Sequence, residues 1–288
     1  MTLPNIQVFG KPLEKLVETI SQGIGIRYKP KATRNEADAE AYKIEVLAKA
    51  EAKALIIRSE AESEIALRAQ ERLFTLEINR QNNLENIIDK SIKHLDETVS
   101  ETPVDDDWRT RFFNKAQDIS TDELQEVWAK ILANEIKSPG NISMRTLDVL
   151  CNLSKDEADL FLKLVSLKFS DIYVMKFGNG TNELNQFDIK YGDILVLREA
   201  GLIFNQDDIH AKLDIEKNED NINGAIIEFG NKKYFVTRKT ATSTYNFPVL
   251  SFTSSGSEIA SIINCKPNYL YLEGFIKYWS NKGYIFTE

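Results

Sequence analysis

The sequence predicts a mainly α-helical protein with an α+β carboxyl-terminal part. Residues 31–102 contain no glycine and no proline, and their first two thirds consist largely of the residues with the lowest cost in a helix. After Phe169, short alternating runs of aromatic and β-branched residues, including 226–229, 234–238 and 247–253, are separated by Asn and Gly clusters, as in β-hairpins. We therefore expect four parts: an amphipathic segment at 1–30, a long helical rod at 31–102, a four-helix module at 103–169 and a winged-helix-like α/β domain at 170–288.

Composition narrows the classes of function. The 288 residues carry a formal net charge of -8, whereas a general nucleic-acid binder needs clustered Lys and Arg to release counterions. Nucleic acid is therefore not the expected partner. No apolar run approaches the about 18 residues of a membrane-spanning helix, and the opening residues lack the pattern of a secretory signal. We expect a cytoplasmic protein, with peripheral contact at the inner membrane as a further option.

Few residues of the kinds that usually carry catalysis or bind metals are present. Cys151 and Cys265 lie far apart in sequence and form no Cys-x-x-Cys motif, and the histidines are His94 and His210. The sequence contains no phosphate-binding loop, serine-hydrolase elbow or zinc-protease motif. We therefore expect no enzymatic activity, no cofactor and no bound metal.

The amino-terminal segment is amphipathic and basic. Residues 5–28 carry apolar side chains at steps of three and four, which is the spacing of one helix face. Residues 1–30 contain four basic and two acidic side chains. One interpretation is a helix that lies on an anionic membrane surface. The other is a helix that packs on the base of the rod.

The rod is the strongest signal for assembly. If residues 33–80 form one helix, it is roughly 70 Å long, longer than an ordinary domain can bury. An apolar seam with many alanines runs along it: Ala37, Ala41, Ile44, Ala48, Leu55, Ile65, Ala69 and Leu76. A strict coiled coil would have Leu, Ile or Val at most of these positions, whereas alanine allows close helix approach. Because an exposed helix gains most of its stability from packing, we expect homo-oligomerisation through residues 33–100.

The module at 103–169 carries start and stop signals for four helices. Asp105, Asp106 and Asp107 stand before Trp108, where carboxylates stabilise a helix amino terminus. A Mg²⁺ site is the alternative interpretation of these three acids. Trp108 and Trp128 are the expected aromatic anchors of the core.

Two capping boxes are expected in the same module. Ser120 with Glu123, and Ser154 with Glu157, have the required spacing. The apolar stripe that follows the first box ends at a Pro-Gly pair, which is a stop signal. Ser143 is then placed to cap a short helix.

A string of residues in this module resembles a signature of uncharacterised bacterial proteins. It comprises Asp106-Asp107-Trp108, Phe112, Ala116, Ser120, Gln125, Trp128-Ala129, Ile131-Leu132-Ala133, Glu135, Pro139-Gly140, Ser143, Arg145-Thr146-Leu147 and Leu150. It is similar to families grouped near the Abi-alpha abortive-infection proteins, and the start Phe9-Gly10-Lys11-Pro12 is shared. The resemblance covers about residues 5–165, with Asn134 where the family pattern has Gly. It implies a bacterial cytoplasmic protein of antiphage defence with no established active site.

The candidate signature or interaction residues are Asp106, Asp107, Trp108, Phe112, Trp128, Glu135 and Arg145. Glu135 and Arg145 are polar residues among apolar neighbours. An ion pair between their two helices is one explanation, and a surface for a partner or effector is the other.

The carboxyl-terminal part has the order of elements of a winged-helix domain. A helix at Tyr191–Ala200 is closed by Gly201, and hairpin strands follow. The segment Phe252-Thr253-x-x-Gly256 resembles the segment that follows the hairpin strands in winged-helix domains. Phe252 replaces the usual Leu, and the loop at 205–223 is long for the fold.

The charges of this domain favour a protein partner over DNA. Its expected recognition helix carries Lys190 and Arg198 but also Asp193 and Glu199, which suits neither phosphate nor guanine. The expected wing has a small basic edge of Lys232, Lys233, Arg238 and Lys239. Two functions therefore compete: a non-enzymatic defence protein that acts through oligomeric assembly, and a winged-helix adaptor or transcriptional regulator that binds a protein partner or DNA.

Overall fold

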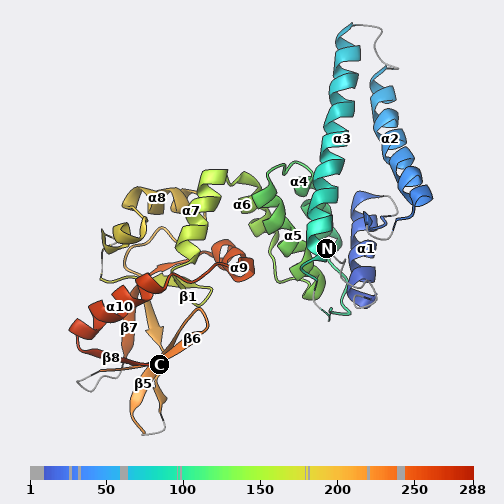
Figure 1. Cartoon of the computed structure of the whole chain (residues 1–288). Coiled ribbons are helices and arrows are strands. Elements are labelled where there is room, and N and C mark those ends of the chain that lie inside the picture. Colours follow the sequence, from blue (N-terminus) through green and yellow to red (C-terminus); the bar gives the residue numbers. More distant parts are fainter. Residues whose placement is uncertain are drawn as a thin grey trace. The chain divides into compact units, whose positions relative to one another are not determined.

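Figure 1 shows the computed structural model of the chain. The structure describes all residues except 1–9, 26–27, 32–33, 59–63, 96, 98, 179, 181, 219–220 and 239–243. The chain forms two compact units, Met1–Leu147 and Asp148–Glu288. Their boundary falls inside helix α6, Met144–Asn152. The expected boundaries at 102/103 and 169/170 therefore do not separate compact units, and the expected four-helix module is divided between the two.

Helix α1, Gly10–Ile24, buries its apolar face within the first unit. Leu16 and Ile20 are fully buried. A Cβ atom added at Gly23 would lie 2.1 Å from the Phe113 ring, so this glycine permits close packing of α1 on Phe113. The apolar stripe of α1 therefore packs within the unit, chiefly on the helices at 106–116 and 122–137, whereas the expected packing was on the base of the rod. Residues 5–9 and 26–27 of the segment lie outside the described residues.

The expected rod is not one helix. Two helices, α2 at Glu36–Arg58 and α3 at Glu64–Ile92, lie side by side (Figure 1). They are antiparallel, because Tyr42 near the start of α2 bonds to Glu85 near the end of α3, while Lys53 pairs with Glu77. A helix that folds back on its neighbour buries part of its own surface within the chain and gains stability from this packing, which explains the correction. We call this pair the α2–α3 hairpin.

Small side chains form the contact inside the hairpin. Ala50, Ala54 and Ala66 are buried, which fits the close approach that alanine allows. The seam identified in the sequence is mostly on the outside: Ile44, Leu55, Ile65 and Leu76 are 58%, 54%, 77% and 40% exposed. The apolar residues expected to drive self-association are therefore left uncovered by the chain's own hairpin.

Helices α4, Asp106–Ala116, and α5, Asp122–Lys137, complete the first unit. The Asp105 carboxylate caps α4 by accepting the Trp108 backbone N–H at 2.9 Å, as the sequence predicted. The expected capping box of Ser120 with Glu123 was wrong. Thr121 is the N-cap residue of α5, and its side chain makes no capping bond.

The second unit combines short helices with two antiparallel sheets. Its helices are α7 (Lys155–Val165), the 3-10 helix η3 (Asn182–Phe187), α8 (Tyr191–Glu199), α9 (Ser254–Ile262) and α10 (Tyr269–Asn281). One sheet has the order β1-β2-β7-β3, with strands Lys168–Phe169, Tyr173–Met175, Tyr245–Ser251 and His210–Leu213. The other has the order β4-β5-β6-β8, with strands Glu216–Lys217, Asn223–Phe229, Lys232–Arg238 and Tyr284–Thr287. The capping box of Ser154 with Glu157 at α7 is confirmed. Together with the first unit, this confirms a mainly α chain whose carboxyl-terminal part is α+β.

The segment 252–256, which resembles winged-helix domains, makes a tight backbone contact with residues 202–203. Ile203 and Phe252 form a β-bridge, and Thr253 caps α9 by accepting the Gly256 N–H at 3.0 Å. A Cβ atom at Gly256 would lie 2.0 Å from the Leu202 carbonyl oxygen, so the site requires glycine. Gly201 has a φ of 73°, in the left-handed region, and ends α8. The similar spacing in winged-helix domains therefore corresponds to a real contact in this chain, while assignment to that fold stays a hypothesis.

Hydropathy identifies no membrane-spanning helix in the part of the chain that the structure describes. There, no helix combines the length with the apolar character that spanning requires.

Candidate functional site

The aromatic signature residues form the core of the first unit. Trp108 stacks on Phe112 with ring centroids 5.1 Å apart, and Phe112 contacts Trp128 at 5.2 Å. All three side chains are buried. A side chain without access to solvent cannot contact a partner, so these three residues stabilise the unit and do not form a binding surface.

Trp108 and Glu135 hold the same turn. The Trp108 Nε1–H donates to the Ile142 carbonyl oxygen at 2.8 Å. The fully buried Glu135 carboxylate accepts the backbone N–H of Gly140 at 2.6 Å and that of Ile142 at 3.4 Å. The turn that joins α5 to α6 is therefore fastened by two signature residues from two helices.

The expected ion pair between Glu135 and Arg145 was wrong. Arg145 is exposed on α6, and the Glu135 carboxylate instead satisfies backbone N–H groups of the turn. The physical reason is that a buried carboxylate needs several hydrogen-bond donors. The backbone N–H groups of a turn supply them, whereas an arginine would lose side-chain entropy on being ordered there. Asp106 and Asp107 are exposed in the first turn of α4, where Asp106 pairs with Arg109 at 2.9 Å.

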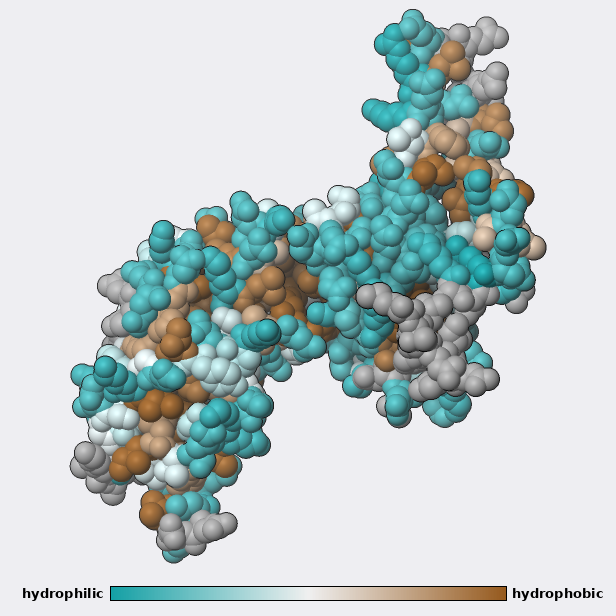
Figure 2. Space-filling view, in the orientation of Figure 1, coloured by the Kyte–Doolittle hydropathy of each residue, from teal (hydrophilic) through white to brown (hydrophobic). Residues whose placement is uncertain are grey.

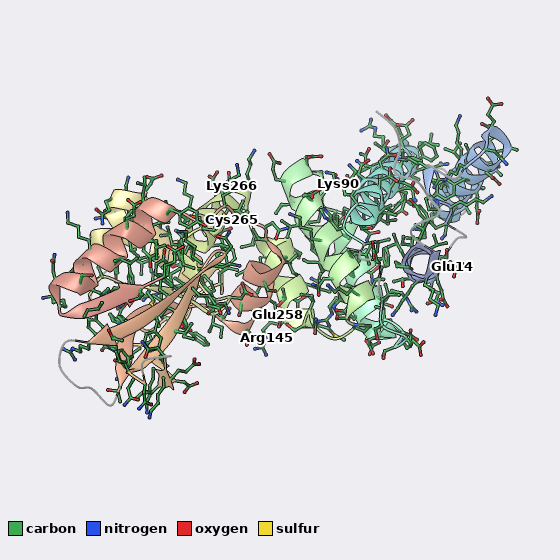
Figure 3. All side chains as sticks on the ribbon, turned by 60° about the horizontal axis from the view of Figure 1, so that its bottom comes forward. Glu14, Lys90, Arg145, Glu258, Cys265 and Lys266 are labelled. Carbon is green, nitrogen blue, oxygen red and sulfur yellow. The ribbon has the colours of Figure 1, made fainter. Side chains whose placement is uncertain are left out.

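The Cys265 thiol is half-buried in the second unit. Burial raises the pKa of the Cys265 thiol, whose Sγ donates to the Leu162 carbonyl oxygen at 3.5 Å (Figure 3 labels Cys265). A raised pKa disfavours the nucleophilic thiolate. Among the described residues, no group of three or more His, Cys, Asp and Glu side chains is arranged to hold a metal ion.

A buried polar cluster at the base of the hairpin was not predicted. The Arg34 guanidinium lies 3.8 Å from the centre of the Tyr42 ring and pairs with Glu85 at 3.2 Å. The Tyr42 hydroxyl donates to Glu85, and Gln81 donates to the Tyr42 oxygen at 2.8 Å. Burial raises the pKa values of Tyr28 and Tyr42 well above the usual range. The cluster ties the segment before α2, and α2 itself, to α3.

A groove opens along one side of the α2–α3 hairpin, away from this cluster. Its lining residues are Glu51, Ala54, Leu55, Leu67, Gln70, Glu71 and Phe74, and its volume is about 540 Å³. The α2 residues are spaced i, i+3, i+4, and the α3 residues are spaced i, i+3, i+4, i+7. Each wall is therefore one continuous helical stripe. Figure 2 shows apolar surface, in brown, along the hairpin.

The Arg198 side chain of helix α8 is engaged within the chain. Arg198 is nearly buried, with 6% of its side chain exposed, and pairs with Asp207. Asp193 accepts the Lys190 backbone N–H at 2.8 Å and so belongs to the amino-terminal cap. The outward side chains Tyr191, Leu195 and Val196 are 51%, 40% and 39% exposed. The exposed face of α8 is thus largely apolar.

Basic side chains of the expected wing also have local partners. Lys232 pairs with Glu288 at 2.7 Å, Lys233 pairs with Glu228, and the Arg238 guanidinium lies 5.1 Å from the centre of the Tyr284 ring. Lys239 lies outside the described residues. Ion pairing of this kind lowers the net positive charge that could attract phosphate groups.

Comparison with known proteins identifies a family for this chain but assigns no activity to it. The model of the family described as "Protein of unknown function (DUF2806)" matches residues 67–275, which start inside α3 and end inside α10. No curated protein and no solved structure matches the chain.

Proposed function

We propose that this chain, which belongs to the DUF2806 family, is a non-enzymatic protein that acts through oligomeric assembly of its α2–α3 hairpin. The groove along the hairpin is the observation that carries this proposal. The two helical stripes and the apolar side chains between them form a groove of the kind that a further helix occupies in helical bundles. Leu55 and Leu67, both in this groove, are each 54% exposed in the single chain.

The charges around the groove favour a second copy of the same chain as the occupant. Glu51 and Glu71 line the groove and are exposed, and Arg72, the residue that follows Glu71, is exposed as well. None of these three takes part in an ion pair with another described residue. Two hairpins related by a two-fold axis would bring the carboxylates of one copy to the arginine of the other, since such an interface uses the same patch twice.

Light scattering on the full chain tests this assembly. We expect the wild-type chain to be a dimer or larger at tens of micromolar, and Leu67→Glu to shift it to monomer, because a charge would be buried against Leu55 and Phe74. Leu270→Glu, at a position 73% exposed on α10, is the matched control and should leave the mass unchanged.

Two outcomes would count against the proposal in different ways. A wild-type monomer at that concentration would refute assembly altogether. If Leu67→Glu stays assembled while Ile44→Glu or Leu76→Glu dissociates, the outer seam and not the groove forms the interface.

The narrower proposal is antiphage defence of the abortive-infection kind. Its support is the resemblance of residues 5–165 to proteins near the Abi-alpha group, together with the assembly surface. We expect phage plating to fall when the gene is present and to recover with Leu67→Glu, which removes assembly without touching the core. Trp128→Ala is less informative, because Trp128 is fully buried and its loss would test folding. Plating that is unchanged across a broad phage panel would remove this proposal.

The second candidate is an adaptor or transcriptional regulator that acts through the carboxyl-terminal unit. The bridge of Ile203 with Phe252 and the capped α9 support it, because they lie in the segment whose sequence resembles winged-helix domains. The local pairing of Arg198, Lys232 and Lys233 favours a protein partner over DNA. Binding of a defined operator by the full chain at physiological salt would instead support a DNA-binding regulator.

A further inference from the structure

Helix α8 has apolar residues on both faces. Ile194 and Leu197 are fully buried in the second unit, whereas Tyr191 and Leu195 stand one turn apart on the exposed side. A helix on the surface of a monomer normally turns polar residues toward water. The outward ridge of Tyr191, Leu195 and Val196 is called the α8 face below.

A glycine within the α8 face is not required by the chain's own packing. A Cβ atom added at Gly192 would meet no atom within 4 Å, and its φ lies outside the left-handed region. Glycine is a poor helix former compared with alanine, so the fold gains nothing evident from it. Open space above a glycine is a place where the backbone of another helix can come close.

The surroundings of the α8 face are acidic. Residues 182–208 carry six carboxylates and two cationic side chains, Lys190 and Arg198. Two of the six carboxylates have cationic partners, since Asp188 pairs with Lys163 and Asp207 pairs with Arg198. The Arg198 charge is nearly buried on Asp207 and is not available to a partner. Glu199, one turn after Leu195, is exposed, as is Asp208. An apolar ridge within an acidic surface fits a ligand that is apolar on one side and basic on its borders.

We propose that the α8 face binds a basic amphipathic helix of a partner protein. Tyr191 and Leu195 would pack against the apolar stripe of that helix, Gly192 would permit close approach, and Glu199 would meet Lys or Arg at its border. This is the helix-on-helix mode of peptide recognition. Phosphate groups would be repelled by the same carboxylates, which separates this partner from nucleic acid. The site does not involve the α2–α3 hairpin and is independent of assembly through it.

Fluorescence anisotropy with a labelled peptide tests the α8 face on the full chain. The probe is a Leu/Lys amphipathic helix of about five turns, and the comparison peptide has the same composition in a scrambled order. We expect the amphipathic order to bind more tightly than the scrambled one. Leu195→Asp should weaken binding by about tenfold, the effect of losing an anchor at the centre of an interface. Gly192→Leu should do the same, because it fills the open space without a clash inside the chain.

The sign of the Leu195→Asp effect separates apolar docking from mere charge attraction. An added carboxylate would strengthen a purely electrostatic interaction with a basic peptide, whereas it weakens docking on an apolar ridge. Leu270→Asp on α10 is the matched control, since Leu270 is also an exposed leucine. Equal binding of the two peptides, or unchanged or tighter binding by Leu195→Asp, would overturn the proposal.

Discussion

Phe112→Ala is expected to lower the free energy of unfolding of the first unit by about 3–5 kcal/mol, the range for loss of a buried aromatic side chain. Phe112 is fully buried and contacts Trp108, Phe113 and Trp128 at centroid distances of 5.1 to 5.2 Å. Three large rings around it cannot collapse into the space without leaving their own contacts, so a cavity remains. Urea unfolding of the full chain followed by circular dichroism measures the loss.

The matched control for that substitution is Phe204→Ala. Phe204 is 47% exposed in the loop after α8, so the same truncation removes little buried surface there. We expect its effect to stay within about 0.5 kcal/mol, as for exposed sites. Equal effects of the two substitutions would show that the aromatic cluster is not the core of its unit.

Local sequence rules predicted the elements that depend on neighbours in the chain. The cap by Asp105, the box of Ser154 with Glu157 and the close of α8 at Gly201 each depend on contacts within a few residues. The strands β5, β6 and β7 followed from alternation, which is likewise local. Such signals need no knowledge of what lies elsewhere in the fold.

The hairpin and the groove could not be predicted in this way. Whether α2 packs against another chain or folds back on α3 depends on where the helix is interrupted, and residues 31–102 contain neither glycine nor proline. The helical spacing was correct, but it does not show that α2 folds back on α3. Leu67, Gln70 and Phe74 form a recognisable stripe on α3, yet only the opposite wall on α2 makes it a groove.

Buried polar residues were the hardest to predict. Glu135 was expected either to pair with Arg145 or to belong to a partner surface, and its carboxylate accepts two backbone N–H groups of a turn. Arg34 and Glu85 are 51 residues apart and meet because the hairpin folds back. No spacing rule connects such residues, since their contact follows from the tertiary fold.

The second large effect is expected for Glu85→Ala at the base of the hairpin. Arg34 and Glu85 form an ion pair whose side chains are 9% and 8% exposed. Removal of Glu85 leaves the guanidinium buried without its counter-charge and takes the acceptor from the Tyr42 hydroxyl. Breaking a buried pair from one side costs about 3–5 kcal/mol. We expect that loss in urea unfolding, with early hydrogen exchange in α2 as its local sign.

Two further variants separate loss of the pair from loss of side-chain volume. The double substitution Arg34→Met with Glu85→Leu should be clearly more stable than Glu85→Ala alone, because it leaves no unpaired charge in the interior. Glu64→Ala breaks the exposed pair with Arg68, whose side chains are 77% and 72% exposed, and should cost less than about 1 kcal/mol. If Glu85→Ala is as mild as Glu64→Ala, the cluster is hydrated and does not fasten α2 to α3. If the double variant is the least stable of the three, the cation–π contact of Arg34 with Tyr42 contributes more than the ion pair does.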